Sequence, residues 1–387
     1  MKKAALHNLG CKVNAYETEA MQHLLEEAGY EIVPFTQKAD VYVINTCSVT
    51  NMADRKSRQM LHKAKKNNPD SIVVAAGCYV QTSEKEVLND LSVDIIIGND
   101  RKHDLVRLLE EYSLDSVNDT VDDINDGRHD FEELFIDQTK EHTRAFIKVQ
   151  DGCNQFCSYC IIPKIRGRFR SVPMQELLNE AKRLASEGVK ELVLVAQETT
   201  LYGKDLTGEK QLPLLLHELC KIEGIEWIRL LYCYPEEITD ELIKVIKTEE
   251  KVCNYIDMPI QHSENRILQR MGRRTSREDL VAVIKKLRKE IPDITIRTTL
   301  ITGFPGESQE DHEGLMNFVE ECQFDRLGVF TYSPEEDTLA ATFEDQIDEE
   351  VKEDRQADIM ELQQEISFDF EADCVGEKLL VMIEGYL

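Results

Sequence analysis

The stretch DGCNQFCSYCIIP, residues 151–163, holds three cysteines within eight positions: Cys153, Cys157 and Cys160. No histidine or fourth cysteine follows closely, whereas a structural zinc site takes four protein ligands and disulfides form from pairs. Closely spaced thiolates are the usual ligands of an iron–sulfur cluster. The spacing therefore predicts a cluster with three protein ligands and one open iron; a zinc site or three core thiols are the alternatives.

Alternating strands and helices surround this stretch. Six strands are expected between residues 142 and 345, and the cysteine loop follows the first of them: AFIKV, ELVLVA, WIRLLY, YIDMPI, TIRTTLI and RLGVF. This order is typical of a partial TIM-type (β/α)6 barrel, in which functional groups lie at the carboxyl ends of the strands. The cysteine loop occupies such an end.

A separate α/β series precedes the barrel. Residues 1–113 contain the strands KAALHNL, DVYVINT, SIVVAA and DIIIG with helices between them, which predicts a parallel α/β domain. Cys11, Cys47 and Cys78 each come one to three residues after one of these strands. Because ligands of open parallel sheets collect outside the carboxyl ends of the strands, we expect these three cysteines to lie near one another.

Three further segments complete the expected α/β organisation. Residues 114–141 are rich in Asp, Asn and Gly and are expected to form an acidic linker. Residues 346–372 are expected to form a charged helical extension. Residues 373–387 look like the first strand of a small C-terminal β domain, of which only the start is present.

The composition is that of a globular protein. The chain has 387 residues, 42% of them hydrophobic, and we find no apolar run of the roughly 20 residues needed to cross a bilayer. The start, MKKAALHNLG, has no signal-peptide pattern, so we expect a cytoplasmic protein. In that reducing compartment clustered cysteines are expected to hold metal or do redox work.

The charge is strongly acidic and unevenly distributed. The net charge is −28, yet residues 1–100 hold 11 basic and 13 acidic side chains, which leaves −26 for residues 101–387. Nucleic-acid binders usually show a basic surface, so this balance indicates a solubilising surface or a basic partner. The helix expected over residues 54–67 is the exception, because its basic side chains favour an RNA contact: Arg55, Lys56, Arg58, Lys63, Lys65 and Lys66.

The CxxxCxxC spacing after the first barrel strand resembles the radical S-adenosylmethionine superfamily. Together with NLGCKVNAYETEA (8–20), INTCSVTNMADRKSRQ (44–59) and AAGCYVQ (75–81), it makes nearly the whole chain resemble the methylthiotransferase family. The resemblance implies an enzyme that converts an unreactive C–H bond into C–S–CH3. It implies S-adenosylmethionine as cosubstrate and two 4Fe-4S clusters, one on the CxxxCxxC cysteines and an auxiliary one on Cys11, Cys47 and Cys78 that delivers sulfur.

The resemblance also implies contacts to the cosubstrate. Tyr159 matches the aromatic position that packs on the adenine, with an ordinary core role as the alternative. Gln197 and the stretch from Arg297 to Glu307 (RTTLITGFPGE) are expected at strand ends that face the cosubstrate. No catalytic residue is identified.

Other arginines and cysteines receive weaker assignments. The arginines of PKIRGRFRS either steer an anionic group or form a solvated face: Arg166, Arg168 and Arg170. The remaining cysteines have no ligand spacing and are expected to be small hydrophobic residues: Cys220, Cys233, Cys253, Cys322 and Cys374.

Two branches of the family compete for the substrate. LGCKVNAYETEA resembles the branch that methylthiolates threonylcarbamoyladenosine next to the anticodon of tRNA. Four stretches resemble the branch that methylthiolates an aspartate of small-subunit ribosomal protein S-twelve: LVAQETTLYGKD, LLYCYPEEITDEL, CNYIDMPIQH and FDRLGVFTYSPEEDT. We expect the ribosomal protein, because the barrel shapes the pocket and an acidic barrel half suits a basic partner.

Two further expectations concern partners and the class of function. An electron donor such as flavodoxin or ferredoxin is implied. An alternative to an enzyme is an iron–sulfur electron carrier or scaffold without a reaction of its own. Three-cysteine sites argue against it, because a carrier needs no open iron.

Overall fold

The computed structural model describes residues 1–48, 51–112, 118–126, 131–132, 134–136 and 143–383. It divides into two compact units. Unit 1 comprises Met1–Lys140, Gln150–Asn154 and Ile161–Val172. Unit 2 comprises Glu141–Val149, Gln155–Cys160 and Pro173–Leu387. The chain therefore changes unit on each side of the segment that carries Cys157 and Cys160.

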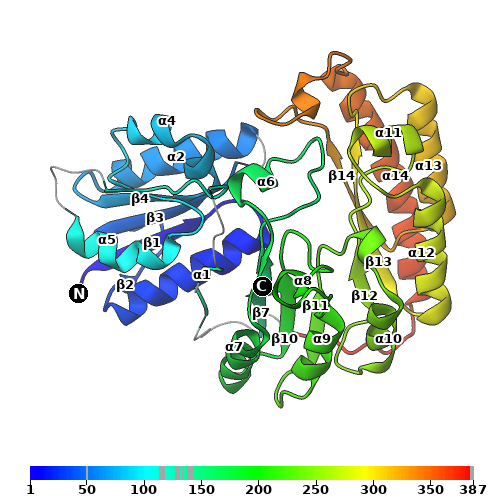
Figure 1. Ribbon diagram of the computed structural model, residues 1–387, viewed down its shortest axis with the longest axis horizontal. Helices are drawn as coiled ribbons and strands as arrows, with labels where there is room; N and C mark the ends of the chain where they lie inside the picture. Colours follow the sequence, from blue (N-terminus) through cyan, green and yellow to red (C-terminus); the bar gives the residue numbers. More distant parts are fainter. Residues whose placement is uncertain (49–50, 113–117, 127–130, 133, 137–142, 384–387) are drawn as a thin grey trace. The chain divides into compact units, whose positions relative to one another are not determined.

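Unit 1 is built on a parallel sheet with the strand order β2-β1-β3-β4-β5-β6 (Figure 1). The strands are β1 Lys3–Asn8, β2 Glu31–Ile32, β3 Val41–Thr46, β4 Ile72–Gly77, β5 Ile95–Ile97 and β6 Asn118–Thr120. The central strands are buried along nearly their whole length, because helices cover both faces of a parallel sheet. The parallel α/β class expected from the sequence is confirmed.

Helices cover the two faces of this sheet. On one face, α1 (Lys12–Glu27) and α5 (Leu105–Glu111) share a buried cluster with the strands. The other face carries α2 (Asn51–Asn67), α3 (Cys78–Thr82) and α4 (Glu84–Leu88). The short 3-10 helix η1, Lys102–Asp104, leads into α5.

Parts of unit 1 were not expected from the sequence. The edge strand β6 lies within the segment expected to be an acidic linker and pairs with β5, Ile96 opposite Asp119. Residues 114–117, 127–130, 133 and 137–141 of that segment lie outside the described residues. Around the cysteine-rich stretch, β8 (Gln150–Asp151) pairs antiparallel with β9 (Arg170–Ser171), and α6 (Ile162–Ile165) lies between them in sequence.

Gly152 explains how this small ribbon closes. Its φ is +77°, and a Cβ at this position would lie 2.4 Å from the carbonyl oxygen of Arg168. Only glycine combines this conformation with so close an approach of two backbone segments.

Unit 2 contains six parallel strands in chain order: β7 Arg144–Lys148, β10 Glu191–Val195, β11 Trp227–Leu230, β12 Tyr255–Asp257, β13 Thr295–Thr302 and β14 Arg326–Thr331. They form the ladders β11-β10-β7 and β12-β13-β14. Backbone hydrogen bonds from Ile228 N to Lys251 O (2.7 Å) and from Cys253 N to Ile228 O (2.9 Å) connect the two ladders. The expected partial (β/α)6 barrel is confirmed.

Helices connect successive strands (Figure 1): α7 Met174–Ser186, α8 Lys204–Thr207, α9 Leu212–Cys220, α10 Asp240–Thr248, α11 Asn265–Arg270, α12 Arg277–Glu290 and α13 Gln309–Cys322. The short 3-10 helices are η2 Pro235–Glu237 and η3 Ala340–Thr342. Two helices begin at complete capping boxes, Ser276 with Asp279 and Ser308 with Asp311, which satisfy the free N–H groups of the first turn.

The long helix α14, Glu349–Asp373, packs along β14 and α13 (Figure 1). Its Gln356 donates to the carbonyl of Val329 and its Gln363 to that of Phe324, each at 2.7 Å. Residues 375–383, where an opening β strand was expected, form no strand, and residues 384–387 lie outside the described part. No helix within the described residues is long and apolar enough to cross a membrane.

Candidate functional site

The second half of the cysteine loop belongs to unit 2. The backbone N–H of Cys160 donates to the carbonyl of Cys157 at 3.0 Å, which forms a tight turn. Between them, Ser158 donates from its N–H to Met271 O (2.9 Å) and accepts at its carbonyl from Ala340 N (2.8 Å). The two cysteines are therefore held on a turn that the rest of the barrel fixes in place.

Tyr234 contacts one of these cysteines. Its phenolic oxygen lies 3.1 Å from the Sγ of Cys157, and the guanidinium of Arg273 lies 3.7 Å above the ring. Burial raises the pKa of Tyr234 far above its usual value, and the thiol of Cys157 raises it further, while Arg273 opposes the shift. The phenol therefore keeps its proton and can donate it in a hydrogen bond to the sulfur of Cys157.

Strained backbone marks the same end of the barrel. Phe156, Tyr232 and Gln261 have φ values of +50°, +60° and +72°. These residues follow β7, β11 and β12 in sequence, within the connections that leave the carboxyl ends of the strands. Non-glycine residues rarely adopt positive φ, and such strain concentrates at functional sites.

Gln197 lies two residues beyond β10, as the sequence predicts. Both its Nε2 and its Oε1 are buried, and neither has a hydrogen-bond partner among the described residues. Because buried amide groups are normally paired, this side chain fits a polar group that a bound cosubstrate would supply.

Glu198, the next residue, was not identified from the sequence. It is only 1% exposed, and burial raises its pKa to about 7 against an opposing hydrogen bond from Thr200. An acidic residue three positions after a buried strand was the signal that could have identified it. The side chain is partly protonated at neutral pH.

Tyr159 lies against the hydrophobic core, whereas Arg297 lies near the start of a strand. Tyr159 packs against a buried cluster that includes Met271 and Phe304, and burial raises the pKa of its phenol. Arg297 is the third residue of β13 and forms an ion pair with Asp257 at 2.6 Å. It therefore lies near the amino end of its strand, and only the later residues of RTTLITGFPGE, around Gly303, follow the carboxyl end.

In unit 1, the three N-terminal cysteines follow neighbouring strands. Cys11 precedes α1 at the end of β1, Cys47 follows β3 directly, and Cys78 is the first residue of α3, after β4. Because β1, β3 and β4 are adjacent, all three lie at one edge of the sheet. Gly10 packs there so closely that a Cβ would lie 2.6 Å from the Sγ of Cys47.

A buried polar network lies beside these cysteines. Asn14 of α1 donates to the carbonyls of Leu9 (2.8 Å) and Thr46 (2.9 Å), which connects the ends of β1 and β3. Its Oδ1 lies 3.7 Å from the Sγ of Cys11 and accepts a 2.8 Å hydrogen bond from Arg166. This network was not expected from the sequence, although the polar residues on the buried side of α1, Asn14 and Glu17, were a usable signal.

Three thiols at one edge of the sheet match the type of ligand that iron–sulfur clusters take. Burial raises the pKa of Cys11, the charge of Arg166 opposes the shift, and Cys78 and Glu17 add to it.

Two of the five remaining cysteines, Cys233 and Cys322, are buried in the hydrophobic core. Burial raises the pKa of Cys233 to about 12 and that of Cys322 to about 11. Their role as small hydrophobic residues stays a prediction.

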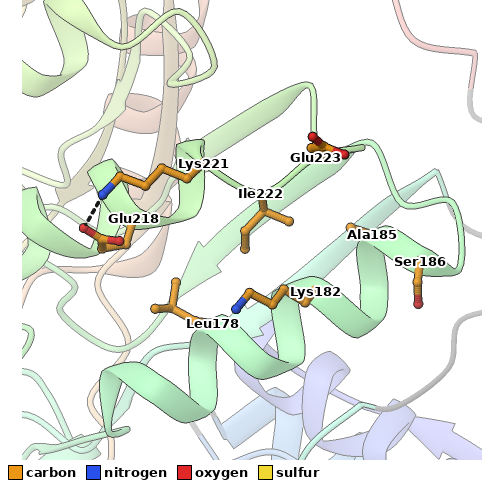
Figure 2. A pocket seen from close by; sticks show the side chains of 8 residues that line it. All are labelled: Leu178, Lys182, Ala185, Ser186, Glu218, Lys221, Ile222 and Glu223. Atoms are coloured by element: carbon orange, nitrogen blue, oxygen red, sulfur yellow. Dashed lines mark hydrogen bonds and ion pairs between the residues drawn. The ribbon is translucent and has the colours of Figure 1, made fainter.

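The hollow in Figure 2 has a volume of about 500 Å³ and contains none of the candidate residues. It lies between the ends of α7 and α9 and includes the ion pair Lys221–Glu218 at 2.7 Å. Because these helix ends precede β10 and β11, the hollow lies near the amino ends of the strands, away from the functional end.

The basic helix α2 presents part of its charge to solvent. Arg55, Lys56, Lys63 and Lys66 are exposed, whereas Lys65 forms an ion pair with Asp94 at 2.6 Å. The opposite side of the helix is buried, and Ser57 hydrogen-bonds the backbone of Cys47. The exposed basic face and the candidate cysteine site therefore share one helix.

Comparisons with known proteins agree with this geometry. Residues 3–98 match the model of the Uncharacterized protein family UPF0004, and residues 147–319 match the Radical SAM superfamily. The chain is 47% identical over 394 residues to the ribosomal protein uS12 methylthiotransferase RimO of Lachnoclostridium phytofermentans, with 98% of this chain and 87% of that protein covered. It is 43% identical over 399 residues to RimO of Clostridium perfringens, with 99% and 87% covered.

Solved structures show the same fold at low identity. The radical S-adenosylmethionine methyltransferase TsrM of Kitasatospora setae matches with a TM-score of 0.61 and 14% identity, covering 85% of this chain and 73% of that one. The cobalamin-dependent S-adenosylmethionine radical enzyme OxsB matches with a TM-score of 0.55 and 15% identity, covering 93% and 56%. At this identity the likeness concerns the fold alone.

Proposed function

Because the chain belongs to the RimO family of ribosomal protein uS12 methylthiotransferases, we propose that it replaces a C–H bond of an aspartate in uS12, the small-subunit protein S-twelve, with C–S–CH3. The observation that carries this proposal is 47% identity over 98% of the chain. The family uses S-adenosylmethionine and 4Fe-4S clusters, which when bound supply the methyl group, the reducing electron and the sulfur site.

The chain's own residues take two sets of roles. Cys153, Cys157 and Cys160 hold the cluster to which S-adenosylmethionine binds, and Cys11, Cys47 and Cys78 hold the auxiliary cluster. Three ligands to each cluster leave one iron open, which supports a catalytic role over a carrier role.

Side chains near the radical cluster orient the cosubstrate. The buried amide of Gln197 has both a donor and an acceptor to offer polar groups of S-adenosylmethionine. The ring of Tyr159 provides an apolar surface beside the cluster. For Arg297, the ion pair with Asp257 favours a structural role over its expected contact with the cosubstrate.

The charge of the chain supports a basic protein partner. Residues 101–387 carry −26, which attracts a basic ribosomal protein. We place the enzyme in the cytoplasm, where ribosomes assemble, with a flavodoxin or ferredoxin as electron donor.

The test is an anaerobic incubation of the reconstituted protein with S-adenosylmethionine, dithionite and either isolated uS12 or small ribosomal subunits. Mass spectrometry should find the methylthio group on an aspartate, and a Cys157→Ala variant should give none. Absence of 5'-deoxyadenosine with either substrate would favour the carrier or scaffold alternative.

A second candidate substrate is tRNA, because α2 presents an exposed basic face. The same incubation with tRNA that carries threonylcarbamoyladenosine separates the two. Methylthiolated adenosine without modified aspartate would replace the ribosomal assignment with the tRNA one.

A further inference from the structure

Arg166 is the one fully buried arginine of the IRGRFR stretch. Its relative exposure is 0%, whereas Arg168 is exposed and Arg170 is half-buried. The reading of these arginines as a solvated face is therefore wrong for Arg166. A guanidinium taken fully out of water is costly unless charged partners surround it.

Carboxylates surround the guanidinium. Its Nη1 and Nη2 donate to Glu17 at 2.7 and 3.0 Å, a two-pronged ion pair, and Nη1 lies 3.0 Å from Asp151. Lys102, also fully buried, lies 3.1 Å from Glu17. Two cations and two anions balance, so the network is neutral before any cysteine thiolate is counted.

Arg166 nevertheless reaches a cysteine sulfur. Its Nη2 lies 3.8 Å from the Sγ of Cys78, within the range of an N–H···S hydrogen bond. Its Nε–H is buried and has no hydrogen-bond partner among the described residues. The two protons of Nη2 also serve Glu17 and Asn14, so its contact with Cys78 is a shared one, and the Nε–H is the donor left unused among the described residues.

The segment that carries Arg166 is fixed against the same cysteine. Ile161 and Ile165 form a buried cluster with Cys78, and Asn99 donates to the carbonyl of Ile165 at 2.7 Å. This segment begins directly after Cys160, the last cysteine of the CxxxCxxC motif, and belongs to unit 1. The sequence that follows the radical cluster's ligands therefore completes the surroundings of the auxiliary site.

We infer that Arg166 is a positioning residue of the auxiliary cluster, which raises its reduction potential by holding a positive charge and an N–H donor against Cys78. The inference rests on the proposed assignment of Cys11, Cys47 and Cys78 as ligands. Hydrogen bonds to cluster sulfurs and nearby charge are established determinants of cluster potential. Reduction adds an electron to the cluster, and a nearby cation stabilises the reduced form.

The experiment isolates the auxiliary cluster. In a background with Cys153, Cys157 and Cys160 replaced by alanine, the cluster is reconstituted anaerobically and titrated with mediators while electron paramagnetic resonance follows reduction. Arg166→Gln should shift the midpoint to a more negative potential, and Arg166→Lys, which keeps the charge but loses the planar fork, should shift it less. Arg168→Gln, two residues away and exposed, is the matched control and should leave the midpoint unchanged.

A double variant keeps the inference testable if Arg166→Gln fails to fold. Arg166→Gln/Glu17→Gln removes one charge of each sign and should restore iron binding if Arg166→Gln loses it, while the negative shift persists. An unchanged midpoint in variants that retain iron overturns the inference. Loss of iron in Arg166→Gln, Arg166→Lys and Arg166→Gln/Glu17→Gln, while Arg168→Gln keeps its iron, also overturns the inference. Arg166 would then be needed only for the structure of the site. A background protein without any cluster would instead refute the ligand assignment.

Discussion

The phenolic oxygen of Tyr234 lies 3.1 Å from the Sγ of Cys157, and Arg273 lies 3.7 Å above the same ring. The residues come from three separate stretches of unit 2, and Arg273 is only 5% exposed. A cation over the ring makes the phenol a stronger hydrogen-bond donor. If the proposed ligand assignment holds, Tyr234 contacts a ligand of the radical cluster in the same way that Arg166 contacts a ligand of the auxiliary cluster.

Tyr234→Phe should remove this hydrogen bond and lower the reduction potential of the radical cluster. The fold should persist, because one hydroxyl contributes about 1 kcal/mol. We expect a more negative midpoint by electron paramagnetic resonance and slower release of 5'-deoxyadenosine with dithionite as reductant.

Tyr255→Phe provides the matched control. Tyr255 also lies beneath an arginine, with Arg229 4.7 Å from its ring, but the thiol that acts on it is that of Cys233, which is not one of the six candidate ligands. Equal shifts in the two variants would show that the effect of Tyr234 does not pass through Cys157.

The six candidate ligands should divide into two independent sites. The reconstituted chain should bind about eight irons, and alanine at Cys153, Cys157 and Cys160 together should leave about four and abolish cleavage of S-adenosylmethionine. Cys233→Ala and Cys253→Ala serve as controls and should keep about eight irons. Loss of all iron in the triple variant, or of half in either control, would contradict the ligand assignment.

The sequence predicted the barrel well because its signals are local. Most strands of unit 2 are short runs rich in apolar residues, β13 alternates buried and half-buried residues, and helices lie between the strands, so parallel pairing follows from the alternation of strands and helices. The positions of Cys11, Cys47 and Cys78 after strands also followed from local pattern. The three strands that these cysteines follow, β1, β3 and β4, are neighbours because the strand order is β2-β1-β3-β4. Local sequence pattern does not determine that order.

The buried charges could not be predicted in this way. Arg166 and Glu17 are 149 residues apart, and IRGRFR has the composition of an exposed basic run. Only the fold brings a carboxylate of α1 to this guanidinium. Edge strand β6 was missed for a related reason: NDT has no apolar residue, and only its pairing with β5 makes it a strand.

Glu198 predicts a pH dependence of stability. Burial raises its pKa from the ordinary value of 4.5 to about 7, so the folded state keeps a proton that the unfolded chain releases above about 4.5. The stability contributed by this proton is present below pH 4.5 and is lost as the pH rises through about 7. The shift corresponds to roughly 3 kcal/mol.

Glu198→Gln should remove this dependence, since the amide resembles the protonated acid at every pH. Urea unfolding should find the two proteins similar near pH 4.5, and the variant more stable by roughly 3 kcal/mol at pH 8. Glu176→Gln, at a carboxylate of α7 that lies on the protein surface, is the control and should show no pH-dependent difference. A constant difference between wild type and Glu198→Gln across this range would contradict the raised pKa.

The uneven charge predicts how substrates associate. Residues 101–387 carry −26, so association with basic uS12 should be fast at low salt. Raising salt from about 0.05 M to about 0.5 M should slow association roughly tenfold, with little change in dissociation, as surface charges are screened. Stopped-flow measurement of labelled uS12 checks this.

The basic face of α2 decides whether RNA takes part. Reversing charge at Arg55, Lys63 and Lys66 together, each to Glu, should leave association with isolated uS12 unchanged or slightly faster, because the face repels a basic protein. Lys182→Glu/Lys221→Glu, at two exposed residues that line the hollow in Figure 2, is the control for added negative charge elsewhere. If the α2 variant modifies uS12 normally but no longer binds tRNA, the basic face of α2 binds nucleic acid, and the reaction on uS12 does not need that contact. A different result would be that the wild type modifies tRNA, that the α2 variant does not, and that the Lys182→Glu/Lys221→Glu control still does. That result would show that the N-terminal motifs and not the barrel determine the substrate.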